Sequence, residues 1–260
     1  MSSYLQRRNP ALKLAALLVV FFALTLVFDP ATPAAFLLIA FVAGRALGGV
    51  TPRQILRVLL PFSVAVLGIF LANALFNRLN GSSPALFYAG PLKVTAPALT
   101  AAASLSFRVL AFAAFSLVFV KTTDASDLIL SLVHQCHLHY RLAYGTLVGY
   151  RMLPLLQGEY ETIRAAHRVR GVQEREGRFA TWGRVRRYAV PLLAGSVRRA
   201  NRVALAMDAR AFGAFPQRSY RRRMVVTARD WWFLAGVAAL AIAVIALLNV
   251  VGLGRFGLGV

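Results

Sequence analysis

Five apolar runs, four in the first half of the chain and one near its end, most restrict what this sequence can fold into. They cover residues 14–28, 34–47, 58–76, 98–120 and 231–251. As α-helices, the last three are long enough to cross a hydrocarbon layer of about 30 Å, whereas the first two are short. The chain is therefore predicted to be an all-α membrane protein with about five transmembrane helices.

The first run has two interpretations. About 15 apolar residues after Arg7, Arg8 and Lys13 resemble the core of a signal peptide. However, the turn at residues 29–33 leads directly into the second run, with no convincing small-residue cleavage site between them. This favours a helical hairpin that stays in the protein.

Positive charge is concentrated between the fourth and fifth runs. Hydrophobic residues make up 58% of the chain, yet the formal net charge is +21, and 20 of the 30 Lys and Arg residues lie between Lys121 and Arg229. We therefore predict N-terminal membrane helices over residues 1–120, a helical cytoplasmic or interfacial domain over 121–230, and a C-terminal transmembrane helix over 231–260. Helices continuous with membrane spans favour anionic lipid or a protein partner over nucleic acid.

The distribution of basic residues also predicts the orientation. With the N-terminus inside, the cytoplasmic segments contain 26 Lys and Arg, against three outside, at Arg78, Lys93 and Arg255. The N-terminus and the basic domain are therefore expected in the cytoplasm of a multi-pass cell-membrane protein. Arg108 lies inside the fourth run and is expected to face protein, because a lipid-facing charge is costly.

Two connecting segments have local signals. The stretch from Asn77 to Pro97 is expected outside, either as a loop alone or as a loop with a short interfacial helix, because its apolar residues 86–88 are too few to cross. Thr122-Thr123-Asp124 predicts a helix start, because its side chains can accept hydrogen bonds from free backbone N–H groups. The following helix should reach about Val133.

Four potential metal ligands, His134, Cys136, His137 and His139, follow this helix. Their spacing matches no strong zinc pattern, and the nearby Arg141 would repel a cation. A polar turn is therefore favoured over a metal site.

Two long amphipathic helices should follow, one from Arg141 to Arg170 and one from about Arg184 to Arg210. Gly145 and Gly149, four residues apart, would allow another helix to approach closely. Arg198, Arg199 and Arg202 should lie outside the buried stripe of the second helix. The predicted buried positions are Met152, Leu155, Leu156, Tyr160 and Ile163 in the first helix, and Ala189, Leu192, Leu193, Val197, Ala200, Val203 and Met207 in the second.

The two helices also share a weak internal repeat. Each contains Pro-Leu-Leu, beginning at Pro154 and Pro191, and Arg170 and Arg210 follow these prolines by 16 and 19 residues. The helices end on Val169-Arg170-Gly171 and Ala209-Arg210-Ala211, with Arg168 and Asp208 just before. Helix termination alone explains one such motif, since a cation in the last turn contributes about 0.3 to 1 kcal/mol. Two motifs in one basic domain indicate two similar devices for two similar partners.

The chain resembles the transmembrane T component of energy-coupling factor (ECF) transporters, the EcfT/CbiQ-like subunits of ATP-driven vitamin and transition-metal importers. The likeness covers nearly the whole chain and is most specific in its C-terminal half. It rests on Asn9-Pro10, Lys13-Leu14, Thr122-Thr123-Asp124 with Asp127-Leu128, residues 150–156, residues 165–171, Pro191-Leu192-Leu193 and residues 204–212.

This resemblance implies that each arginine docks in a groove of one of two ABC ATPase subunits, which are different chains or a homodimer. ATP is used by these partners, no cofactor binds this chain directly, and a membrane-embedded S component selects the substrate. The family usually has Ala-Arg-Gly at both motifs. Val169 adds bulk beside the first arginine, and Ala211 removes the easy left-handed backbone of glycine, a role that Gly213 is expected to take.

The residues themselves agree with a non-catalytic subunit. The sequence has no phosphate-binding Gly-x-x-x-x-Gly-Lys-Ser/Thr loop, no plausible pair of carboxylates and no Ser/His/Asp constellation. Arginine suits a mechanical junction, because its donor fork grips carboxylates and carbonyls in a fixed geometry. The alternative is a stand-alone permease or a membrane-anchored assembly factor. A permease should carry polar residues on several spans, and few are present here.

Overall fold

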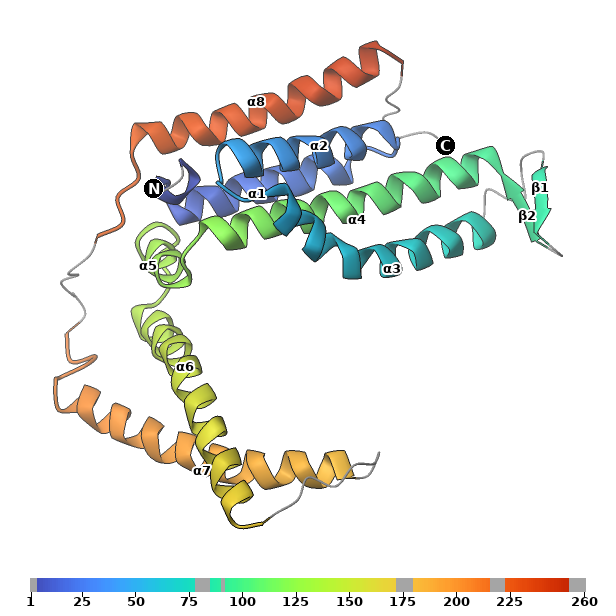
Figure 1. Ribbon diagram of the computed structural model, residues 1–260. Coiled ribbons are helices and arrows are strands. Elements are labelled where there is room, and N and C mark those ends of the chain that lie inside the picture. The colour runs from blue at the N-terminus through green and yellow to red at the C-terminus, as the bar shows by residue number, and fades with distance from the viewer. Residues whose placement is uncertain (1–3, 78–84, 90–91, 172–179, 216–222, 253–260) are drawn as a thin grey trace. The chain divides into compact units, whose positions relative to one another are not determined.

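The computed structural model describes five stretches of the chain, 4–77, 85–89, 92–171, 180–215 and 223–252. These residues form eight α-helices and one two-stranded hairpin (Figure 1). They divide into two compact units. We call residues 1–131 with 224–260 the membrane unit, and residues 132–223 the arginine-rich unit.

The membrane unit contains most of the apolar helices. Its elements are a short 3₁₀ turn (Leu5–Arg7), α1 (Pro10–Thr25), α2 (Ala31–Ala46), α3 (Pro52–Phe76), the strands β1 (Ala85–Ala89) and β2 (Leu92–Thr95), α4 (Ala96–Thr122), the first part of α5 (Ala125–Gln135) and α8 (Ala228–Val250). Helices α3, α4 and α8 are long and apolar enough to cross a membrane, whereas α1 and α2 are shorter, with 16 residues each. The prediction of an all-α membrane protein is confirmed.

Helix α4 is the centre of the membrane unit. Both α2 and α3 pack along it, while α1 packs against α8. Its Ala98, Ala102, Ala111 and Ala114 are fully buried. Small side chains let helix backbones approach closely, so the alanine-rich sequence of α4 allows α2 and α3 to pack along it.

The turn between α1 and α2 is fixed by polar groups within the membrane unit. The Asp29 carboxylate accepts hydrogen bonds from the backbone N–H and the hydroxyl of Thr32, both at 2.8 Å. Arg108 of α4 donates to the Val27 carbonyl, and its guanidinium lies 5.3 Å from the centre of the Phe28 ring. Arg108 therefore faces protein, as predicted, and this turn supplies the partner that the sequence did not reveal.

One local prediction is wrong. Residues 86–88 form part of β1, which pairs antiparallel with β2, and not an interfacial helix. The segment is too short for a stable helix, and its aromatic residues favour a strand next to the Val94 and Thr95 pairing positions. Arg78 and Arg255, which entered the orientation count, lie outside the described residues.

The predicted helix start at Thr122-Thr123-Asp124 is confirmed. Asp124 Oδ1 accepts hydrogen bonds from the backbone N–H groups of Ser126 and Asp127, at 2.8 and 3.2 Å. This side chain satisfies donors that have no partner within the helix. Helix α5 then runs to Gln135, close to the predicted end.

The arginine-rich unit is built on two long helices that cross, α6 (Tyr140–Val169) and α7 (Ala180–Asp208) (Figure 1). At the crossing, Arg199 Nη2 lies 3.1 Å from Glu159 Oε2, and the Glu159 side chain packs directly over Gly195. The Tyr188 ring contacts Tyr160 and His167, with centroids 5.5 and 5.6 Å apart. The prediction of two crossed helices is confirmed.

The packed face of α7 differs from the predicted stripe. Leu193 and Val197 are 63% and 60% exposed, and Ala200 is also exposed, whereas Arg199 lies on the packed face because Glu159 pairs with it. In α6, Leu155 and Tyr160 are likewise more exposed than predicted.

The glycine that lets another helix approach closely is also not one of the two predicted. Among the described residues, nothing lies within 4 Å of a Cβ built on Gly145 or Gly149, so these two do not receive a helix. Gly195, at the crossing, has the close contact instead.

Candidate functional site: two arginine-bearing helix ends

Helix α6 ends in a left-handed turn. Arg170 is the C-cap residue, and its N–H donates to the Ala166 carbonyl at 3.2 Å. Gly171 has a φ of +69°, and its N–H donates to the Arg168 carbonyl at 3.0 Å. A left-handed residue after the cap is the usual way to satisfy the last carbonyls of a helix, and glycine adopts it without steric cost.

Helix α7 also ends in a left-handed turn, and its left-handed residue, Ala211, directly follows another arginine, Arg210. Ala211 has a φ of +55°, and its N–H donates to the Asp208 carbonyl at 2.9 Å. The N–H of Phe212 donates to the Met207 carbonyl at 3.0 Å. These two bonds define a Schellman motif in which Arg210 occupies the cap position.

The two arginines are therefore equivalent in backbone terms, since each caps a long helix and precedes a left-handed residue. The expectation that Gly213 replaces Ala211 in this role is wrong. Gly213 does have a φ of +93°, but Ala211 keeps the left-handed conformation itself. For a residue with a Cβ this costs roughly 1–2 kcal/mol, so the surroundings of α7 must offset it.

Those surroundings come from the start of α6. The Phe212 ring packs against Tyr140 and Tyr144, with centroids 5.9 Å apart in both cases. Arg141 Nη2 donates to the Gly213 carbonyl at 3.1 Å. The end of α7 is thus held by three side chains of another helix, which were not among the predicted site residues. Their only sequence signal was an aromatic pair one turn apart, followed 68 residues after Tyr144 by Phe212.

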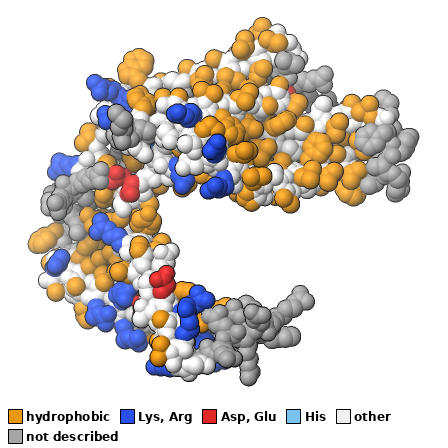
Figure 2. Space-filling model, viewed as in Figure 1, with side chains coloured by type: hydrophobic (Ala, Val, Ile, Leu, Met, Phe, Trp, Pro, Cys, Tyr) orange, Lys and Arg blue, Asp and Glu red, His pale blue; other side chains and the backbone are white. Residues whose placement is uncertain are grey.

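The side chains of the two motifs are open to a partner. Arg168, Arg170, Asp208, Ala209 and Arg210 are all exposed, and Val169 is 89% exposed. Figure 2 shows Lys and Arg side chains gathered over the arginine-rich unit, with few acidic ones between them. Two exposed guanidinium groups at rigid helix ends suit carboxylates and carbonyls presented by another protein.

Pro154 and Pro191 lie inside their helices and away from the motifs. Each lacks an N–H and so leaves the carbonyl four residues earlier without its helical bond. Pro154 is about 24 Å from Arg170 along the α6 axis. The structure therefore does not bring the prolines close to the arginines. Each proline is related to the site only because it lies in the helix that carries an arginine.

His134 lies within α5 and not after it as predicted, whereas Cys136, His137 and His139 follow the helix in a turn in which His137 has a φ of +51°. His137, His139 and Arg141 line a hollow together with residues 213–215. In the described part of the chain, no three His, Cys, Asp or Glu side chains gather as a metal site would need.

The family model CbiQ, described as cobalt transport protein, matches residues 1–220. This chain belongs to the CbiQ family, and the predicted resemblance to T components of energy-coupling factor transporters is confirmed.

Individual relatives agree. The energy-coupling factor transporter transmembrane protein EcfT of Streptococcus thermophilus is 25% identical over 257 residues, which are 92% of each chain. EcfT of Limosilactobacillus fermentum is 26% identical over 254 residues, 94% of this chain and 90% of the relative. A putative ABC transporter ATP-binding protein of Bifidobacterium longum is 27% identical over 255 residues. That match covers 94% of this chain, but the chain spans only about a third of that relative's length.

Proposed function

We propose that this chain is the coupling subunit of an ECF-type importer, which passes ATP-driven movement of two ATPase subunits to a substrate-binding S component. In this proposal the N-terminus and the arginine-rich unit lie in the cytoplasm, in line with the excess of basic residues in the segments predicted to be inside. The cargo is a vitamin or a transition-metal ion, which the S component selects.

The equivalence of the two helix ends carries the proposal. Arg170 and Arg210 occupy the same cap position, each before a left-handed residue and each exposed. Two similar ends on one subunit match two similar docking grooves on a pair of ATPases. Because each arginine sits on a long helix, a movement of the groove is transmitted along the helix and not absorbed by a loop.

The Bifidobacterium longum relative supports ATPase partners. Its name includes ATP binding, and about two thirds of its length lies outside the match to this chain. Since this chain has no phosphate-binding loop, the ATP-binding part of such a protein would lie in the unmatched portion. A relative that joins both parts in one polypeptide favours a working association between them.

The exposed apolar face of α7 is the proposed contact for the S component. Val190, Leu193 and Val197 are all more than half exposed and lie three and four residues apart, so they form one stripe. An unpaired apolar stripe of this kind is typical of a surface that another protein covers.

Purification tests the proposal. The tagged chain is extracted from its native membrane in mild detergent, and we expect a pair of ABC ATPase subunits to copurify, as identified by mass spectrometry. The Arg170→Ala/Arg210→Ala double variant should insert normally but lose both ATPases. A matched control, Arg198→Ala/Arg202→Ala, removes two exposed arginines from the α7 flank and should keep them.

A stand-alone permease or assembly factor makes the opposite prediction. The chain would purify without ATPases, and the two double variants would behave alike. Recovery of the ATPases with the Arg170→Ala/Arg210→Ala variant would refute the role of the two arginines even if the complex itself exists.

A further inference from the structure

The chain passes between the two units twice. It leaves the membrane unit within α5, between residues 131 and 132, and returns between residues 223 and 224, just before α8. These two crossings are the covalent routes by which a movement of the arginine-rich unit reaches the membrane helices. The contacts that the chain makes within the membrane unit at each crossing therefore decide which membrane helices move with the arginine-rich unit.

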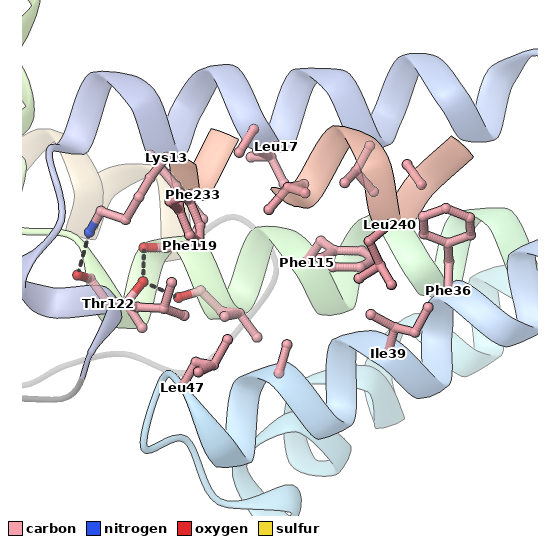
Figure 3. A pocket seen from close by; sticks show the side chains of 17 residues that line it. Lys13, Leu17, Phe36, Ile39, Leu47, Phe115, Phe119, Thr122, Phe233 and Leu240 are labelled. Atoms are coloured by element: carbon pink, nitrogen blue, oxygen red, sulfur yellow. Dashed lines mark hydrogen bonds between the residues drawn. The ribbon is translucent and has the colours of Figure 1, made fainter. Parts of the chain in front are cut away.

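Lys13 makes the contact within the membrane unit next to the first crossing, where the chain leaves through α5. This lysine lies in the first turns of α1 and is only 5% exposed, and its Nζ donates to the carbonyl of Thr122, the last residue of α4, at 2.8 Å (Figure 3). The Asp127 carboxylate in the first turn of α5 also attracts the ammonium group. Lys13 thus joins the start of α1 to the junction from which α5 departs.

The setting of Lys13 strengthens this contact. Apolar side chains, among them Leu17, Phe119 and Phe233, line the pocket into which the lysine extends (Figure 3). A buried ammonium is costly unless it is paired, and the low dielectric of such walls strengthens the bonds that it does make. The sequence placed Lys13 ahead of the first apolar run, and the structure adds its burial and its partner, the Thr122 carbonyl.

Asp230 makes the corresponding contacts next to the second crossing, where the chain returns before α8. It lies in the first turn of α8, and its Oδ2 accepts from the backbone N–H and the hydroxyl of Thr227, at 3.0 and 2.7 Å. Its other oxygen faces the residues before α1. Oδ1 accepts from the Asn9 backbone N–H at 3.4 Å and lies 3.6 Å from Arg8 Nη1. Asn9 in turn caps α1 through the N–H of Ala11.

We infer that Arg8, Asn9 and Lys13 form an N-terminal clamp. It binds the membrane unit at both crossings, next to α5 and at the start of α8, so that α1 moves with them. Residues 8 and 9 bind the start of α8, and Lys13, one turn into the helix, binds the end of α4. Lys13 and Asp230 are thus positioning residues for transmission from the arginine-rich unit to α1. This inference rests on the proposed coupling function.

Distances between spin labels test the clamp in the complex with its copurified ATPases. The native Cys136 is replaced by serine, and a reference label is placed at Val64→Cys on α3. A second label is placed either at Val185→Cys on α7, away from the proposed S-component contact, or at Leu18→Cys on α1, and all three labelled sites are exposed. Electron paramagnetic resonance measures each distance with and without a non-hydrolysable ATP analogue.

In the chain without clamp substitutions, we expect the analogue to shift both distances, by roughly 2 Å or more. Lys13→Met keeps the volume of the side chain but removes the charge. It should leave the shift at α7 and abolish the shift at α1, as should Asp230→Asn. Lys13→Arg keeps a donor and should retain the shift at α1. Lys121→Met, which removes an exposed lysine beside the clamp, is the matched control and should also retain it.

The outcomes separate the clamp from the function on which it rests. A shift at α1 that persists in the Lys13→Met/Asp230→Asn double variant overturns the clamp, as does a shift at α7 with none at α1 before any clamp substitution. Absence of any shift at α7 in that starting chain overturns the coupling function, and the clamp with it. A purely structural role predicts loss of folded complex and of both shifts together.

Discussion

The ends of α6 and α7 have the same backbone design but different support. Each places an arginine at the cap and a left-handed residue after it. At the end of α6, that residue is glycine, and the motif side chains are exposed. At the end of α7, that residue is alanine, and Phe212 and Gly213 are held by Tyr140, Arg141 and Tyr144.

This difference shows that a helix end can be fixed by two independent means. Glycine makes the left-handed turn locally inexpensive, so α6 needs no neighbour to form it. Alanine makes the turn costly, and in α7 tertiary contacts offset that cost. The arginine position is thus set by the backbone in one case and by packing in the other.

Removal of one arginine at a time should have the largest effect on this comparison. Arg210→Ala and Arg170→Ala should each weaken ATPase association by roughly 10-fold or more, because a hydrogen bond to a charged group contributes about 1.5–3 kcal/mol. The loss should be greater for Arg210, whose helix end is held before binding. Titration of the purified variants with the ATPase pair measures both affinities.

Equal losses for the two single variants would show that the support of α7 does not favour binding. Arg202→Ala, on the exposed flank of the same helix, is the control and should bind normally. A greater loss for Arg170 would reverse the assignment of the better-held end.

Phe212→Ala should loosen the end of α7 alone. The substitution removes both ring contacts with α6, and aromatic pairs contribute about 0.5–1.5 kcal/mol beyond the burial of their area. Hydrogen exchange at the amides of residues 209–212 should accelerate by about 10-fold, while residues 168–171 keep their rate. Phe215→Ala, at an exposed phenylalanine nearby, is the control. Equal acceleration at both helix ends would mean that they share one source of stability.

Local signals in the sequence predicted the helices and their ends well. Asp124 caps α5 as its position before an apolar run indicated, and Gly171 adopts the left-handed turn that glycine after a basic residue favours. Such features depend on side chains a few residues apart, so they can be derived from the sequence alone.

Features that depend on distant partners were missed. Lys13 and Thr122 are 109 residues apart, and Arg108 and Val27 are 81 apart, so nothing local pairs them. The prediction of the packed face of α7 was wrong for a related reason. An amphipathic helix has a wide apolar face, and one crossing helix covers only part of it, here the part with Gly195 and Arg199.

Exchange of the two left-handed residues should have a moderate effect of opposite sign at the two ends. Gly171→Ala introduces a Cβ at a φ of +69° and should destabilise the last turn of α6 by about 1 kcal/mol. Ala211→Gly removes a Cβ at a φ of +55° and should stabilise the last turn of α7 by a similar amount. Hydrogen exchange of the last-turn amides should therefore change by about fivefold in each variant, faster at α6 and slower at α7.

The same pair of variants can contradict this account. If Ala211→Gly leaves exchange unchanged, the contacts of Phe212 and Arg141 fix the turn so firmly that the residue itself adds nothing. Gly145→Ala, in the interior of α6 with open space around it, is the control and should slow exchange in α6 slightly.

Val169→Ala should have the smallest effect. Val169 is 89% exposed, and exposed substitutions of this kind usually change stability by less than about 0.5 kcal/mol. The substitution gives α6 the same residue before its arginine that Ala209 gives α7. If only the arginines and their backbone matter for docking, ATPase affinity should stay within about twofold, as measured by the titration used for the single arginine variants. A large gain in affinity would instead mean that the valine obstructs the groove, and the two helix ends would then differ in fit as well as in support.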